Sequence, residues 1–109
     1  MNVRLYILQR ATAALMAPLV LIHIAVIFYA TRQGMTAADI LSRTHGSMAW
    51  ASFYGVFVVA VAIHAAIGIR NILTEWSPLK PRGVDAIVVL FGLALATLGF
   101  RAVAAVVLL

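Results

Sequence analysis

Three histidines, His23, His45 and His64, are the residues of this chain best able to bind a metal ion. The chain contains no cysteine, so neither thiolate ligands nor disulfides can form. An imidazole binds a metal through a neutral ring nitrogen, but it can also simply hydrogen-bond a neighbouring helix. Any metal chemistry of the chain must therefore use histidine, and the surroundings of each histidine bear on which role it has.

His64 occurs deep within a long apolar segment, six residues before Arg70. In a helix this spacing corresponds to about 9 Å. Ala60 and Gly68, four residues to either side, share its face and leave a shallow trough where a flat macrocycle or another backbone could approach. Ionisable residues at such depth usually face the protein interior and have a partner. The pattern suits a metal-bound ring, and it equally suits a neutral imidazole bonded to an adjacent helix.

His23 lies thirteen residues after Arg10, about 20 Å further along the first apolar segment. Its neighbours at four residues to either side, Leu19 and Ile27, are bulky, so we expect its face to be filled and His23 to be a structural histidine. His45, in the sequence RTHGS, is expected to be an exposed loop residue.

The elements that carry these histidines are predicted to be membrane-spanning helices. The chain is 65% hydrophobic and 10% charged, a composition typical of a membrane protein. A span needs roughly 20 apolar residues, and three stretches, 11–31, 44–69 and 84–109, are long enough. We therefore predict an all-α integral membrane protein with one domain, 1–109, and three helices at about 8–31, 44–73 and 83–108.

Charges mark the ends of these helices. Basic residues favour the cytoplasmic side of a membrane. Five of them would lie on one side (Arg4, Arg10, Arg70, Lys80 and Arg82), against Arg32 and Arg43 on the other. This predicts a cytoplasmic N-terminus. The net charge of +5 does not indicate nucleic-acid binding, because the basic residues are dispersed at helix ends instead of clustered on one polar face.

The acidic residues and the turn residues define the loops. Asp39, Glu75 and Asp85 all fall at or near interfaces, which argues against the small proton-coupled drug exporters, since these need an acid within the membrane. Thr36 followed by Asp39 is a helix start signal and predicts a short interfacial turn. The two prolines and the glycine of SPLKPRG are expected to end the second helix.

Two short stretches carry a resemblance to a known family. YILQRATA at 6–13 and IHAAIGIRNILTEW at 63–76, followed by the basic proline-containing loop, resemble the D-type, cytochrome b membrane-anchor subunit of bacterial succinate dehydrogenase and fumarate reductase. The resemblance implies three transmembrane helices that pack with a second anchor subunit into a haem-binding bundle. It also implies a bacterial cytoplasmic (inner) membrane location, and iron–sulfur and flavoprotein subunits as further partners.

The resemblance assigns roles to individual residues. His64 matches an axial ligand of a b-type haem whose other ligand comes from the second anchor subunit, and Gly68 gives the porphyrin room. Arg10 matches an arginine near the haem propionates and the quinone, either ubiquinone or menaquinone. Trp76 falls on a tyrosine that bonds the quinone in the family, so its role departs from the pattern, and Glu75 replaces an aspartate. A ligand role for His23 is implied only if a second haem is present.

The function expected from these features is a non-catalytic, haem-b-binding anchor that docks the flavoprotein and iron–sulfur subunits and helps to form the quinone site. One alternative is a cytochrome b subunit of another respiratory oxidoreductase, although such subunits are usually longer. The other is a non-redox membrane scaffold whose histidines only bond neighbouring helices. The direction of the reaction, the quinone type, the number of haems and the oligomeric state stay open at this point.

Overall fold

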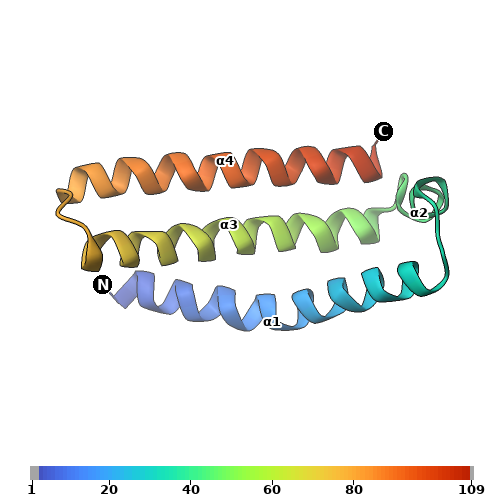
Figure 1. Cartoon of the computed structure of the whole chain (residues 1–109), viewed down its shortest axis with the longest axis horizontal. Coiled ribbons are helices and arrows are strands. Elements are labelled where there is room, and N and C mark those ends of the chain that lie inside the picture. The colour runs from blue at the N-terminus through green and yellow to red at the C-terminus, as the bar shows by residue number, and fades with distance from the viewer. Residues whose placement is uncertain (1–2, 109) are drawn as a thin grey trace.

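The computed structural model describes residues 3–108, which form three long helices and one short one (Figure 1). The long helices are α1 (Val3–Arg32), α3 (Met48–Trp76) and α4 (Pro81–Val107), and the short helix α2 (Ala37–Thr44) connects α1 to α3. All three long helices are long and apolar enough to cross a membrane. The predicted all-α fold with three spans is therefore confirmed.

The helices begin and end at residues other than those predicted. The second span begins at Met48 and not at residue 44, because Gly46 adopts a positive φ of 72° and the hydroxyl of Ser47 then accepts a hydrogen bond from the N–H of Trp50. It continues to Trp76, three residues beyond the predicted end. The third span begins at Pro81, because proline suits the first helical position.

The short helix α2 replaces the turn expected after Thr36. The Thr36 side chain accepts a hydrogen bond from the N–H of Asp39, and the Asp39 carboxylate accepts one from the N–H of Thr36. This reciprocal pair is a capping box. The backbone N–H of Thr36, followed by its hydroxyl, holds the pKa of Asp39 below its usual value.

Different segments of the chain lie at the two ends of the bundle. The N-terminus and the α3–α4 connection lie at one end, and α2 and the C-terminus lie at the other (Figure 1). The Thr44 hydroxyl donates to the carbonyl of Val106 at 2.7 Å, and the N–H of Gly46 donates to the carbonyl of Val107 at 2.7 Å. These bonds satisfy two carbonyls that the last turn of α4 would otherwise leave free, so they tie α2 and its linker to the end of α4.

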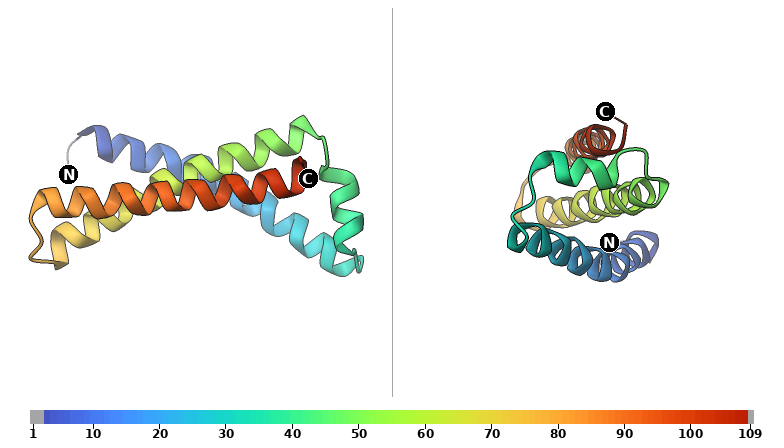
Figure 2. Two further views of the ribbon diagram at one scale, coloured as in Figure 1. Left: turned by 90° about the horizontal axis from the view of Figure 1, so that it is seen from above. Right: turned by 90° about the vertical axis from the view of Figure 1, so that its right-hand side faces the viewer.

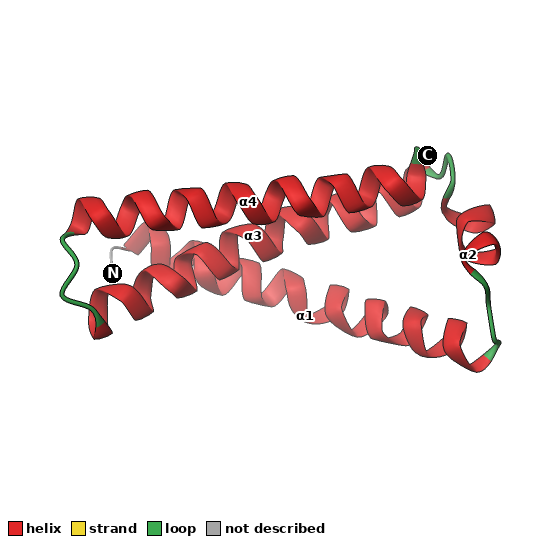
Figure 3. Cartoon of the chain, turned by 45° about the horizontal axis from the view of Figure 1, so that its top comes forward, coloured by secondary structure: helices red, strands yellow, loops and turns green. Residues whose placement is uncertain are grey.

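Helix α3 lies between α1 and α4. Figure 2 shows that α1 crosses α3 obliquely, and Figure 3 shows α1 diverging from the other two long helices towards α2. The α3–α4 pair runs antiparallel, and its register is marked by the ion pair between Arg70 Nε and Asp85 Oδ1, 3.3 Å apart. The obliquity of α1 decides which residues of the first span can reach His64.

Few apolar side chains are buried within the chain itself. The buried apolar residues among 3–108 are Ala60, Ala62, Ile67, Val84, Val88 and Val107. Large apolar side chains are exposed along every span, as with Leu21 at 68% and Leu90 at 68%. A water-soluble bundle could not expose so much apolar surface, which is suited instead to contact with lipid or with other membrane helices.

Candidate functional site

The contact between Thr12 and His64 joins α1 to α3. Thr12 is only 6% exposed, and its Oγ1 atom lies 3.2 Å from His64 Nδ1. The same oxygen lies 2.9 Å from the carbonyl oxygen of Leu8 and 3.0 Å from that of Gln9. His64 itself is half-buried. A contact with a neighbouring helix is one of the two roles that the sequence left open for His64, and the structure shows this contact.

The small residues on either side of His64 do not leave an open trough along their whole length. A Cβ atom placed on Gly68 would lie 3.6 Å from Gln9 Nε2, so α1 occupies this end of the face. Ala60 is 2% exposed. Both residues let α1 approach α3 closely. From the sequence, small residues at this spacing could make room either for a flat macrocycle or for the backbone of another helix, and here they make room for a helix.

A groove runs along α3 beyond His64, in the direction of α2. It has a volume of about 490 Å³ and is lined mostly by apolar side chains and small residues of α3, between Ser52 and Ile63, together with Thr12 and Leu15 of α1 and Phe100 of α4. Thr12 therefore touches both the groove and the His64 ring. His64 itself is not one of the residues that line this groove.

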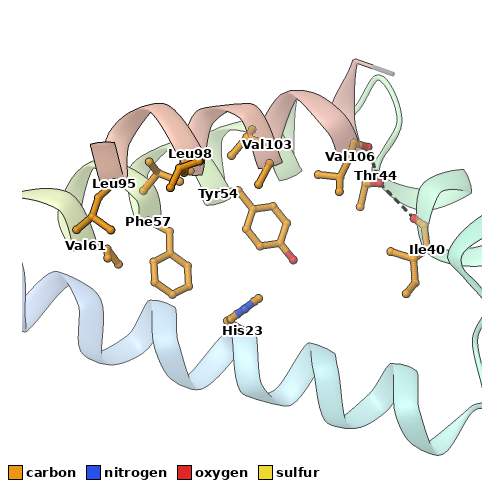
Figure 4. Close-up of a pocket in the computed structure, with 13 residues that line it drawn as sticks. His23, Ile40, Thr44, Tyr54, Phe57, Val61, Leu95, Leu98, Val103 and Val106 are labelled. Carbon is orange, nitrogen blue, oxygen red and sulfur yellow. Dashed lines mark hydrogen bonds between the residues drawn. The ribbon is translucent and has the colours of Figure 1, made fainter. Parts of the chain in front are cut away.

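A larger cavity of about 580 Å³ lies in the half of the bundle nearest α2 (Figure 4). His23 projects into it from α1, and its ring makes edge-on contacts with the rings of Tyr54 and Phe57, with centroids 5.8 and 5.3 Å away. The Nδ1 atom of His23 is buried and has no hydrogen-bond partner within residues 3–108. A cavity beside a buried ring nitrogen without a partner can hold a ligand that forms a hydrogen bond with that nitrogen.

The expectation that Leu19 and Ile27 fill the space in front of His23 is wrong. Neither residue lines the cavity, and Ile27 is 51% exposed. The physical reason is the divergence of α1 from α3 and α4 towards α2, which opens space beside His23 whatever the size of its neighbours on the same helix (Figure 3). Whether His23 binds a second haem stays a prediction.

The third histidine lies outside both spaces. His45 forms the C-cap of α2, where its N–H donates to the carbonyl of Leu41, and its side chain is exposed. The expectation of an exposed loop histidine is therefore confirmed. No group of three His, Asp or Glu side chains in the described part of the chain comes together to hold a metal ion.

The residues expected at the quinone site lie at the N-terminal end of the bundle. Trp76 is the last residue of α3 and is 83% exposed. Arg10 is exposed on α1, with its guanidinium carbon 5.5 Å from the centre of the Tyr6 ring. Glu75, next to Trp76, is also exposed. All three side chains are accessible to a partner subunit or to a lipid-soluble molecule.

Comparison with known protein families decides the class of this protein. Residues 1–100 match the model of the succinate dehydrogenase/fumarate reductase transmembrane subunit. The chain belongs to this family. No curated protein and no solved structure matches the chain. This transmembrane subunit is therefore a multi-pass membrane protein and a component of a succinate dehydrogenase or fumarate reductase complex.

The structure of this transmembrane subunit also contains two polar residues that were not assigned a role from the sequence. Thr12 bonds His64, and Gln9 lies beside Gly68 with its Oε1 atom buried and unpaired within the described residues. Both fall within the YILQRATA stretch that carries the family resemblance. Polar side chains within an apolar span are costly unless they have a partner, and this signal could have directed attention to Thr12.

Proposed function

We propose that this transmembrane subunit binds a b-type haem through His64 and helps to form the quinone site of a bacterial succinate:quinone or quinol:fumarate oxidoreductase. The observation that carries the proposal is the environment of His64. Its ring is half-buried within a membrane span, and Thr12 engages only one of its two ring nitrogens. The other nitrogen is left to act as a ligand.

The groove next to the Thr12–His64 contact has a surface that suits a flat apolar group such as a haem. The groove beside Thr12 is apolar along most of its length and is lined by small side chains such as Ala60. His23 and His45 lie towards the α2 end and cannot share an iron with His64. A second protein ligand would come from a partner anchor subunit, as the family resemblance implies. When bound, the haem supplies one-electron transfer at a potential tuned by its ligands and its burial. His64 would hold the group, and the apolar walls of the groove would keep water away from it.

The N-terminal end of the bundle is proposed to contribute to the quinone site. Trp76 offers an indole N–H that can donate to a quinone carbonyl, and its exposure leaves it free to do so. Arg10 would supply a positive charge towards the haem propionates, whereas the space at Gly68 is taken by Gln9 of α1. The basic residues at this end favour a cytoplasmic orientation in a bacterial inner membrane, where the iron–sulfur and flavoprotein subunits would dock.

The exposed apolar surface supports a second membrane subunit as partner. Side chains such as Leu15 and Val59, which border the groove, are 44% and 45% exposed. A second anchor packed there would bury these side chains and bring its own ligand to the groove. The match to the succinate dehydrogenase/fumarate reductase family favours this function over that of a cytochrome b subunit from another respiratory enzyme.

The experiment that tests the proposal measures haem b per flavin in the purified complex by the pyridine haemochrome method. His64→Ala is expected to remove the haem, because no other imidazole on α3 can replace it. His45→Ala is the matched control and is expected to keep full haem content, since His45 is exposed at the end of α2. A His64→Ala complex with full haem content and an unchanged spectrum would refute the ligand assignment and favour a scaffold function.

A further inference from the structure

The hydroxyl of Thr12 makes three contacts, and they are not equivalent. Two of them, at 2.9 and 3.0 Å, are with the carbonyl oxygens of Leu8 and Gln9, and the third, at 3.2 Å, is with His64 Nδ1. A hydroxyl has one hydrogen to donate and two lone pairs that accept. The contacts therefore restrict where that single hydrogen lies.

The two carbonyl oxygens are acceptors only. If the hydroxyl of Thr12 donated to His64, its lone pairs would face two carbonyl oxygens at about 3 Å with no hydrogen between them. Donation back to the carbonyl four residues earlier is a common arrangement of threonine in helices. The hydrogen is therefore shared between Leu8 and Gln9, and the oxygen can only accept from His64.

This arrangement determines the tautomer of the imidazole. Since the oxygen of Thr12 accepts, His64 Nδ1 carries the ring proton and Nε2 keeps its lone pair. A histidine that binds a metal typically donates its other ring N–H to an oxygen, which holds the ring orientation and makes the ligating nitrogen more basic. Because Thr12 is on α1 and His64 on α3, the ring orientation depends on how these helices pack.

We propose that Thr12 is a positioning residue, whose hydroxyl holds the His64 ring with Nδ1 protonated and presents Nε2 to the iron. This inference rests on the proposed haem-binding function. Thr12 itself does not touch the iron. It acts through the orientation and the basicity of His64.

The test is made on the purified complex with Thr12→Val and Thr12→Ser. Valine keeps the shape of threonine but accepts no hydrogen bond, so the ligating nitrogen becomes less basic and stabilises ferric iron less. We expect the haem midpoint potential to rise and the low-spin ferric electron paramagnetic resonance spectrum to change, because the ring is no longer held. Serine keeps the hydroxyl and is expected to leave both properties close to those of the wild type.

Thr31→Val is the matched control. The Thr31 hydroxyl makes the same bond to the carbonyl four residues earlier, at 2.9 Å from Ile27 O, on the same helix, but it has no histidine contact. This variant is expected to leave the potential and the spectrum unchanged. If Thr12→Val does not assemble, Thr12→Ala removes the hydroxyl without adding bulk and is assessed by the same two measurements.

Two results would overturn the inference. One is an unchanged potential and spectrum in the variant that lacks the hydroxyl. The other is an equal change in Thr12→Ser, which would assign the effect to packing of the methyl group. Loss of haem in His64→Ala together with either result would leave the haem proposal standing and reject only the role of Thr12. Retention of haem in His64→Ala would reject both.

Discussion

Gly99 of α4 lies directly against the side chain of Val58 on α3. A Cβ atom placed on Gly99 would lie 2.6 Å from Val58 Cγ1 and 2.9 Å from Cγ2, closer than carbon atoms can approach. One heptad earlier, a Cβ atom on Gly92 would lie 3.4 Å from the Cβ atom of Ala66, an ordinary contact. The α3–α4 interface is therefore tighter at Gly99 than at Gly92, and Gly99 is also one of the residues that line the larger cavity.

The first prediction concerns this close contact. Gly99→Ala is expected to lower the free energy of unfolding by about 1–3 kcal/mol, because valine is branched at Cβ and cannot turn aside without moving a helix. Titration of the full-length chain in mild detergent with sodium dodecyl sulfate measures this. Gly92→Ala is the control on the same helix and is expected to be tolerated. Equal stability of the two variants would show that α4 can shift without cost.

A second prediction concerns the capping box of α2. Asp39→Ala is expected to speed hydrogen exchange of the α2 amides in the intact complex, since it removes the acceptor for the N–H of Thr36. Asp85→Asn, at the other end of the bundle, is the control and is expected to leave α2 unchanged. Slow exchange in Asp39→Ala would mean that the bonds from Thr44 and Gly46 to α4 hold α2 by themselves.

The capping box is also expected to depend on pH. The pKa of Asp39 in the folded chain lies below its ordinary value of 3.8. A group with a lowered pKa contributes stability that is present above its unfolded pKa and is lost as the pH falls through the folded one. The protection of α2 should therefore be constant near neutral pH and should decline below about pH 4. In Asp39→Ala this decline should be absent.

The third prediction concerns Trp76. Trp76→Ala is expected to lower quinone reductase activity roughly 2- to 10-fold, the effect of one lost hydrogen bond. Succinate oxidation by an artificial acceptor should be unaffected. Trp76→Phe separates the two possible roles, because phenylalanine keeps an interfacial aromatic ring but has no N–H. If Trp76→Phe is fully active, or if Trp76→Ala affects both assays equally, Trp76 is an interfacial residue only.

The fourth prediction concerns the number of haems. We expect one haem per flavin, with no change in His23→Ala. Besides His23, the polar side chains lining the cavity are those of Thr44 and Tyr54, and neither provides a second imidazole. The cavity is nevertheless large, and His23 Nδ1 has no partner within the described residues, so the number of haems per flavin is measured in the wild type and in His23→Ala. A ratio near two that falls to one in His23→Ala would make His23 an axial ligand of a second haem.

The sequence alone determined the class of the protein and the local structure. Three apolar segments of sufficient length predict three spans, because lipid leaves a spanning backbone no hydrogen-bond partners other than its own. The start of α2 at Thr36 could be predicted because a capping box involves residues only three positions apart. The position of His64 deep within a membrane span could also be predicted, because it depends only on the spacing of residues along one helix.

The tertiary structure decided everything that depends on a second helix. The pairing of Thr12 with His64, the contact of Gly99 with Val58 and the cavity beside His23 all follow from how α1 and α4 pack on α3. The prediction that bulky residues fill the space around His23 was wrong for this reason. Residues four positions away describe only one face of the same helix. The space in front of that face depends on where the next helix lies. In a membrane the apolar pattern does not specify that position, because lipid-facing and helix-facing surfaces are equally apolar and close packing alone distinguishes them.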